Sequence, residues 1–349
     1  MCNSAIFGRE SGLIAATNSA ASVVCFSLIQ FIESTRLIRI LRIFRHLSEF
    51  RNVRRPVVTT GTFDGVHNGH RKILQNLLEV SRSVDGEATL FTFEPHPRIV
   101  LHPEDHGLQL LNSPEEKATL LREVGLNNVI IHPFTPEFSK FSAVEYVRDF
   151  LVNALGVHTI VIGYDHHFGK NREGDFELLK ELAEIYGFEV VEIPAHEIDD
   201  CKVSSTKIRN ALLEGEAKKA NSYLGYNYSI LGKVIEGKQL GRKFGFPTAN
   251  IKPEYDLKLV PGFGVYAVRV KIENEWRGGM LNIGNNPTIA DGQGRSIEVN
   301  IFDWNDDIYG KTITLEFIDR IRDELKFENT DQLIDEMHKD KQKALHLLG

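Results

Sequence analysis

The chain has 349 residues, of which 42% are hydrophobic and 26% charged, and its formal net charge at pH 7 is −7. This length predicts two domains, and the composition is typical of a globular protein. The acidic balance argues against a nucleic-acid-binding protein, and three scattered cysteines exclude a disulfide framework or a cysteine metal site. We therefore expect a reducing compartment, the cytoplasm.

The first forty residues need a separate interpretation. Residues 20–32 are apolar but too short to span a bilayer, and arginines then alternate with leucine and isoleucine over residues 36–45. The order of charge and apolar residues is not that of a signal peptide. We expect residues 1–40 to be a disordered or non-native extension, and the alternative is a helix lying on a membrane surface.

A strand–helix alternation begins at residue 57 and continues to residue 213. The predicted strands cover residues 57–60, 88–93, 129–132, 159–162 and 188–193. Helices are expected to begin at Ser113 and Ser142, each with a capping-box glutamate three residues later, and over 176–186, closed by Gly187. Repeated strand–helix units predict a parallel sheet with helices on both faces and ligands beyond the carboxyl ends of its strands.

The segment GTFDGVHNGH, residues 61–70, lies where the first of these strands turns into a helix. Unpaired backbone N–H groups at a helix N-terminus attract anions, and the glycines allow close backbone approach. His67 and His70 add two polarisable donors, so we interpret the turn as a nucleotide-phosphate site; two histidines that are merely structural are the alternative. Asp64 is expected either to cap the helix or to orient a nearby amide or histidine.

Two further motifs follow later strands of this half. In GYDHHFGKNREGD, residues 163–175, Asp165 can accept a hydrogen bond from an adenine amine or a ribose hydroxyl. In SSTKIRNAL, Ser205 or Thr206 is expected to cap a helix whose first turn presents Arg209, which together make a phosphate clamp. A plain polar loop and an ordinary helix cap are the alternatives.

The segment FEPHPR, residues 93–98, ends another predicted strand. Its prolines fix an extended conformation. Phe93 and His96 either line a flat aromatic pocket or belong to a rigid loop without a binding role.

After residue 213 the pattern changes. A short helix over 217–223 leads to closely spaced strands, predicted at residues 228–235, 264–272, 276–283, 296–302 and 312–318. Strands in succession without intervening helices predict an antiparallel barrel. The chain then ends in a helix over 331–348, acidic at its start and basic at its end, as the helix dipole favours.

A basic glycine-rich loop, GKQLGRKFGFPTANI, covers residues 237–251 and can wrap phosphates with its amides. It has three glycines at four-residue spacing and an arginine: Gly237, Gly241, Gly245 and Arg242. It lacks the ending of a Walker loop. Thr248 and Asn250 point the same way from an extended segment, so their oxygens can hold Mg²⁺ with phosphate oxygens. A glycine-rich hairpin without a ligand is the alternative.

The strand RSIEVNIFDW, residues 295–304, carries a candidate general base. Glu298 is expected to share one face with Ser296 and Asn300, opposite the apolar residues. A glutamate that simply faces solvent is the alternative.

The motifs of the first half resemble the adenylyltransferase half of bacterial bifunctional riboflavin kinase/FMN adenylyltransferases, the FAD synthetases, within the H-x-G-H nucleotidyltransferases. GTFDGVHNGH is similar to their ATP-binding signature, GYDHHFGKNREG to their second nucleotide loop and SSTKIR to their phosphate motif. The resemblance implies that His67 and His70 bind the α- and β-phosphates, that Asp165 lies near the nucleoside and that Arg209 contacts the departing phosphates. The other ATP-binding residues it implies are Gly61, Phe63, Asp64, Gly65, Ser205 and Thr206.

The second half resembles the riboflavin kinases over residues 228–348. Their catalytic strand is similar to RSIEVNIFDW, which implies that Glu298 deprotonates the 5′-hydroxyl of the ribityl chain. Family enzymes often have histidine where Asn300 stands. The flavin-binding residues that the two resemblances imply are Arg320, Arg322 and Phe327 in this half, and Phe93 and His96 in the first.

We therefore expect an α/β plus β chain: a Rossmann-like parallel-sheet nucleotidyltransferase domain over 41–213, a linker over 214–227, and an antiparallel Greek-key-type β-barrel with a C-terminal helix over 228–349. The expected activities are phosphorylation of riboflavin to FMN and adenylylation of FMN to FAD with release of pyrophosphate, both using ATP and Mg²⁺. The expected partners are small molecules only, without nucleic acid or membrane, and the expected state is a monomer or weak homo-oligomer.

Two alternative functions remain. One is a nucleotidyltransferase with a cytidyl donor or a pantetheine or nicotinate acceptor, for which a second phosphate loop at 237–251 would be unnecessary. The other is a non-catalytic flavin-binding regulator, against which the retained His67, His70, Arg209 and Glu298 argue.

Overall fold

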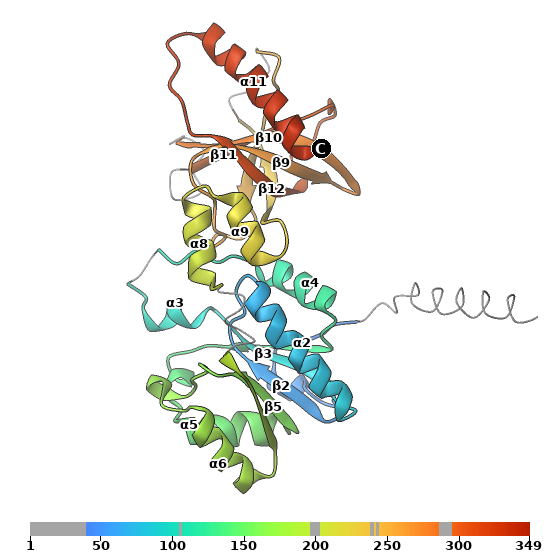
Figure 1. Ribbon diagram of the computed structural model, residues 1–349, viewed down its shortest axis with the longest axis vertical. Coiled ribbons are helices and arrows are strands. Elements are labelled where there is room, and N and C mark those ends of the chain that lie inside the picture. Colours follow the sequence, from blue (N-terminus) through green and yellow to red (C-terminus); the bar gives the residue numbers. More distant parts are fainter. Residues whose placement is uncertain (1–39, 105–106, 196–202, 238–240, 242–243, 286–294) are drawn as a thin grey trace, which may run out of the picture. The chain divides into compact units, whose positions relative to one another are not determined.

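The computed structural model of the chain (Figure 1) describes residues 40–104, 107–195, 203–237, 241, 244–285 and 295–349. Leu41–Gly349 forms one compact unit. The extension expected over residues 1–40 lies outside the described residues except for Ile40, so its disorder stays a prediction. Among the described residues, no helix is both long enough and apolar enough to cross a membrane.

Six parallel strands form one sheet in the first half, in the order β1-β4-β3-β2-β5-β6. These strands are β1 (Arg42–Phe44), β2 (Pro56–Thr60), β3 (Glu87–Glu94), β4 (Asn128–Pro133), β5 (Thr159–Gly163) and β6 (Glu189–Ile193). The parallel sheet confirms the predicted fold. The short edge strand β1 was not predicted.

Helices surround this sheet (Figure 1). They are α2 (Asn68–Ser83), α3 (Pro97–Leu101), α4 (Pro114–Val124), α5 (Ala143–Glu145), the π-helix η3 (Tyr146–Ala154) and α6 (Phe176–Tyr186), with 3-10 turns η1 (Leu47–Glu49), η2 (Phe138–Lys140) and η4 (Lys170–Arg172). Alternate residues of β2 face different clusters. Val57 packs with Leu74 of α2 and Leu121 of α4, whereas Val58 packs with Leu179 of α6, so both faces are covered.

Both predicted capping boxes are present. The Ser113 hydroxyl accepts from Glu116 N while the Glu116 carboxylate accepts from Ser113 N, and Ser142 and Glu145 repeat the arrangement. α6 ends at Gly187, whose φ of 76° lies in the left-handed region that glycine adopts without strain. These helix ends are confirmed because they depend on side chains only three residues apart.

The helix that follows Ser142 differs from the prediction. α5 gives way at Tyr146 to η3, whose backbone bonds span five residues, as from Leu155 N to Phe150 O at 3.0 Å. The sequence predicts that a helix begins at Ser142, but its apolar pattern does not distinguish the two helix types, because both keep apolar side chains on one side. The expected α-helix is therefore corrected to a π-helix.

Two helices, α8 (Ser205–Leu213) and α9 (Ala217–Leu224), lead to the second half. The N-cap of α8 is Ser204, whose hydroxyl accepts from Lys207 N at 3.3 Å. The prediction that Ser205 or Thr206 caps this helix is wrong, because three consecutive hydroxyl residues leave the cap undetermined from sequence. Ser205 instead donates its hydroxyl to the backbone carbonyl of Asp64 at 2.9 Å.

The second half is a closed antiparallel barrel of six strands in the order β10-β11-β8-β7-β12-β9. Its elements are β7 (Ser229–Ile235), β8 (Ala249–Pro253), β9 (Gly264–Ile272), β10 (Glu275–Asn285), β11 (Arg295–Ile301), β12 (Thr312–Arg322) and the helix α11 (Thr330–Leu348). The predicted barrel and C-terminal helix are confirmed. α11 packs on the outside of the barrel, where Met337 and Ala344 join Ala267 of β9 and Met280 of β10 in one cluster.

The barrel and the sheet half are joined through residues 110–112. Leu110 N donates to Leu257 O at 2.7 Å, and Leu259 N donates to Leu110 O at 2.9 Å. Between them Lys258, 3% exposed, donates to Leu111 O at 2.7 Å and pairs with the Glu116 carboxylate at 2.5 Å. The N-terminal end of α4 is thus held by a charge from the barrel half.

We expect Lys258→Met to lower stability by about 3 kcal/mol, because it leaves the partly buried Glu116 carboxylate without its cation. Calorimetry should show a Tm lower by several degrees. The double variant Lys258→Met/Glu116→Leu should recover much of that loss, since an apolar pair replaces both charges. Equal Tm values for Lys258→Met and the native chain would contradict a stabilising pair.

Candidate active sites

The predicted phosphate turn is built around two stacked histidines. His67 is the N-cap of α2, and its Nδ1 accepts a hydrogen bond from His70 N at 3.3 Å. The two imidazole rings stack with centroids 3.6 Å apart, and the Phe63 ring lies 4.6 Å from that of His70. The cap that was one option for Asp64 is therefore wrong, because His67 occupies that position.

Both histidines are neutral near pH 7. Burial lowers the pKa of His67 to about 4, and burial, with the nearby His67 ring and the Lys117 cation, lowers the pKa of His70 well below its usual value. Because His67 Nδ1 is an acceptor, its ring proton is on Nε2. His70 Nδ1 is covered and has no hydrogen-bond partner among the described residues. The pair can therefore offer hydrogen bonds to a phosphate without carrying full charges.

Asp64 holds the loop together instead of facing solvent. It is 2% exposed, and its carboxylate accepts from Leu111 N at 2.9 Å and Asn112 N at 3.4 Å. Arg209 donates to the same carboxylate at 2.6 Å and to Gln109 O at 2.9 Å. Asp64 thus orients backbone amides, the other option that the sequence left open, and it fixes the position of Arg209.

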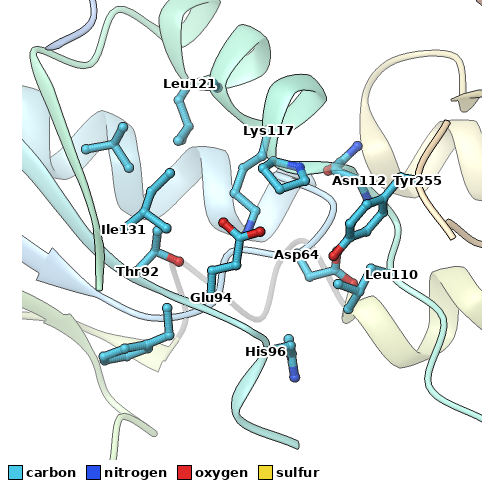
Figure 2. A pocket seen from close by; sticks show the side chains of 14 residues that line it. Asp64, Thr92, Glu94, His96, Leu110, Asn112, Lys117, Leu121, Ile131 and Tyr255 are labelled. Atoms are coloured by element: carbon cyan, nitrogen blue, oxygen red, sulfur yellow. The ribbon is translucent and has the colours of Figure 1, made fainter. Parts of the chain in front are cut away.

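A small cavity lies beside this carboxylate, at the carboxyl end of β3 (Figure 2). Its volume is about 30 Å³, and the polar side chains that line it include Asp64, Thr92, Glu94, His96 and Lys117. A single water needs about 10–15 Å³ by this measure, so the cavity has room for a small group and none for a three-ring flavin. Phe93 and His96 both line it, and their contact with a flavin stays a prediction.

The remaining predicted residues of this half lie at different places. Gly65 has φ 89°, and a Cβ there would stand 2.7 Å from Leu111 Cδ1, so this close approach requires glycine. Gly61, with φ 155°, begins the same loop. Asp165 and Thr206 are exposed and do not line the cavity of Figure 2.

The barrel carries a second polar arrangement across three neighbouring strands. In the register of the ladder, Glu298 on β11 lies opposite Asn250 on β8 and opposite Asn282 on β10. Its strand neighbours Ile297 and Val299 are buried in the barrel core. The predicted alternation on this strand is therefore confirmed, and Glu298 stands on the outer face of the barrel.

Two cavities lie at β11, one on the face of Glu298 and one on the opposite face, at Val299 and Ile301. One, of about 340 Å³, lies between the barrel and α11 and is lined among others by Thr248, Glu298, Asn300, Arg322 and Phe327. The other, of about 370 Å³, is lined by Thr248 and by residues 304–309. Thr248 lines both cavities.

The glycine-rich loop packs closely against the same residues. A Cβ at Gly237 would lie 1.8 Å from Asn250 Nδ2, and a Cβ at Gly241 would lie 2.2 Å from Phe246 O. Asn300 Nδ2 donates to Pro247 O at 2.7 Å, which fixes the residue before Thr248. Gly245 is exposed with φ 79°. Arg242, predicted to bind phosphate, lies outside the described residues.

The predicted flavin-side residues of the barrel separate into two groups. Arg322 lines the cavity between the barrel and α11. There its guanidinium pairs with the buried Asp340 carboxylate at 2.8 Å and lies over the Phe327 ring at 5.8 Å. Arg320 does not line that cavity, because its guanidinium donates to the carbonyls of Glu214 and Phe263. The structure therefore brings Arg322 and Phe327 together and leaves Arg320 apart.

Sequence reasoning missed Lys117 and Lys258. Both are charged side chains that extend into covered positions, Lys117 to Thr62 O at 2.8 Å and Lys258 to Leu111 O. Lys117 stands next to Ala118 and Leu121, the apolar positions of an amphipathic helix. That position was the one signal in the sequence that its side chain would be covered. Nothing local in the sequence marked Lys258, because its partners are more than 140 residues away.

Two family models match the chain. One, described as FAD synthetase, matches residues 50–207, and the other, described as riboflavin kinase, matches residues 224–348. Proteins named bifunctional riboflavin kinase/FMN adenylyltransferase are similar over most of the chain. The one from Listeria monocytogenes is 38% identical over 82% of this chain and 90% of its own, and the one from Escherichia coli K12 is 36% identical over 84% and 93%.

A solved structure from Streptococcus pneumoniae, titled a macrolide-efflux protein, has a TM-score of 0.77 and 32% sequence identity. It covers 87% of this chain and 98% of its own. Its title names a different activity from the family models, and the likeness supports the fold.

A sheet domain with stacked histidines at a helix N-terminus, followed by a barrel with a glycine-rich loop, defines a two-domain transferase. The chain belongs to the bifunctional riboflavin kinase/FMN adenylyltransferase family, with the FAD synthetase part first and the riboflavin kinase part second.

We expect the stability of the His67→Asn variant to fall less than that of the native chain as the pH is lowered. Unfolded histidine titrates near pH 6.5 and folded His67 near 4, so the unfolded chain binds more protons in between and stability falls as the pH drops through that window. Asparagine keeps the cap without titrating. Tm measured from pH 7 to 4.5 should therefore fall less steeply in the variant, although His70 and His96 still contribute. The same slope in both proteins would contradict this account.

We expect Gly237→Ala to abolish riboflavin phosphorylation while FAD formation from FMN continues, because its methyl group would displace the Asn250 amide. Gly310→Ala is a control for destabilisation of the barrel without a steric contact, since Gly310 has φ 76°, where a side chain strains the backbone, but a Cβ there meets nothing within 4 Å. Product chromatography with each substrate measures both activities. Full kinase activity in Gly237→Ala would show that the close contact is dispensable.

Proposed function

We propose that the barrel transfers the γ-phosphate of ATP to riboflavin, giving FMN, and that the sheet domain transfers AMP from a second ATP to FMN, giving FAD and pyrophosphate. The observation that carries this proposal is the presence of two separate polar sites in one chain. One surrounds His67, His70 and Arg209, and the other surrounds Thr248 and Glu298. Both family models and the named relatives agree with this division.

In the sheet domain the acceptor needs no general base. The phosphate of FMN is already an anion, so the barrier lies in bringing it in line with the α-phosphate of ATP. The neutral His67 and His70 would donate hydrogen bonds to the α- and β-phosphates, and the fixed Arg209 would neutralise the departing pyrophosphate. The free amides of the turn at the N-terminus of α2 would complete the anion site.

In the barrel the acceptor is an alcohol and does need a base. Glu298 would accept the proton of the ribityl 5′-hydroxyl as its oxygen attacks the γ-phosphate. The cavity beside α11 would hold riboflavin, with Arg322 and Phe327 against its ring system, and the cavity lined by residues 304–309 would hold ATP. Thr248, which lines both, would stand where the phosphate passes from one substrate to the other.

The residues at Thr248 fit Mg²⁺. Asn250 is buried, and its Oδ1 has no hydrogen-bond partner among the described residues, so an oxygen suited to a hard cation is available in register with Glu298. The Thr248 hydroxyl and Asn250 Oδ1 would hold the ion together with phosphate oxygens. A bound Mg²⁺ would supply neutralisation of phosphate charge.

We also propose that the chain acts in the cytoplasm on small molecules only, as a monomer or weak homo-oligomer. The acidic net charge and the few, scattered cysteines support this setting. Light scattering on the purified chain measures the oligomeric state, and a stable higher oligomer would contradict it.

Two substitutions test whether each half of the chain carries one of the two activities. Glu298→Gln should lower riboflavin phosphorylation roughly 10²- to 10⁴-fold, as loss of a general base does, and should leave FAD formation from FMN intact. His70→Ala should do the reverse. Glu275→Gln is the control, an exposed glutamate on β10 of the same barrel. Flavins separated by chromatography give both rates, and a chain that converts neither riboflavin nor FMN would overturn the proposal.

A further inference from the structure

Lys117 of α4 extends into the cavity at the end of β3. Its ammonium group lies there beside Asp64, Glu94 and His96 (Figure 2). It donates one hydrogen bond, to Thr62 O at 2.8 Å. Within the part of the chain that the structure describes, no carboxylate pairs with it and no second acceptor contacts it. An ammonium group has three hydrogens to donate, so two are left for a ligand.

This position is costly without a ligand. Burial lowers the pKa of Lys117, while Asp64 and Glu94 act in the opposite direction. An ammonium group removed from water loses its hydration and requires compensating hydrogen bonds or charge. One backbone carbonyl replaces only part of what water supplied.

Two carboxylates, of Asp64 and Glu94, line the same cavity, and both have cations near them; that of Glu94 lies 4.0 Å from Arg45. Asp64 accepts from Arg209 and from the Leu111 and Asn112 amides, so its charge is largely compensated. Lys117 and His96 line the same cavity, and the positive charge of Lys117 contributes to the lowered pKa of His96 and of His70. With the Asp64 carboxylate held by Arg209, Lys117 brings the positive charge and the remaining N–H donors to this space, and an anionic oxygen can accept from them.

The size of the cavity limits which anion group enters. About 30 Å³ takes a small polar group and excludes a purine or a flavin ring. The cavity that Lys117 lines is also lined by Phe93 and His96, the residues expected on the acceptor side. The phosphate end of the acceptor is therefore the group that matches both the charge and the space.

We propose that Lys117 binds the phosphate monoester of the acceptor, FMN, and holds it for attack on the α-phosphate of ATP; this rests on the proposed function of the sheet domain. In that step a phosphate oxygen of FMN forms the new bond to the α-phosphorus, and the bond from this phosphorus to pyrophosphate breaks. Pyrophosphate leaves with the electron pair. Lys117 keeps its proton throughout and contributes charge and position.

The full-length chain with Lys117→Met or Lys117→Arg tests this assignment. FAD formation is measured while FMN and ATP are varied separately. Loss of a charged hydrogen-bond donor should raise the KM for FMN in Lys117→Met by roughly 10- to 100-fold, with the KM for ATP changed less than about twofold. Lys117→Arg should recover most of the affinity for FMN, since it keeps the charge. Riboflavin phosphorylation by the same proteins should be unchanged, which also reports that each variant is folded.

Arg122→Gln is the matched control, because Arg122 is an exposed cation on the same helix and its loss changes net charge equally. An unchanged KM for FMN in Lys117→Met, with a lower Tm, would overturn the inference and leave Lys117 as a support for Thr62. A rise in the KM for ATP alone would also overturn it, since the lysine would then bind the donor. If the native chain makes no FAD from FMN, the proposed function itself fails and this inference falls with it.

Discussion

The buried carboxylate of Asp64 is the interaction on which the sheet-domain site depends. It joins the loop after β2, the backbone of residues 111–112 and Arg209 of α8, three segments that are far apart in the sequence. A carboxylate that is 2% exposed is stable only when its lone pairs are occupied, and here two amides and a guanidinium occupy them. The same contacts that compensate this charge also set the direction of Arg209, so stability and site geometry have one cause.

The barrel site depends on a different constraint, the absence of side chains. Gly237 and Gly241 let the loop backbone lie against Asn250 and Phe246, and Asn300 holds Pro247 from the other side. Thr248 is therefore presented on a segment fixed from both directions. The Asn300 amide donates to the Pro247 carbonyl, so it positions the residue before Thr248.

Much of the fold could be predicted because its signals are local. The capping boxes at Ser113 and Ser142, the stop at Gly187 and the alternation around Glu298 each involve residues within a few positions of one another. The N-cap of α8 was predicted wrongly, because three consecutive hydroxyl residues could each cap the helix. The partners of Asp64, Lys117 and Lys258 could not be predicted, because each contact joins segments between about 45 and 150 residues apart and depends on tertiary packing.

Leu111, together with Ile208 and Leu212 of α8, belongs to the same hydrophobic cluster as the barrel residues Tyr228 and Leu259. The boundary between the two catalytic halves therefore runs through a shared core and does not follow an exposed tether. A proteolytic cut or a premature stop that removed the barrel would expose these side chains to water. It would also remove Lys258, the cation that pairs with the Glu116 carboxylate. Each half therefore covers apolar surface of the other, so the two halves of the chain depend on each other for the burial of these side chains.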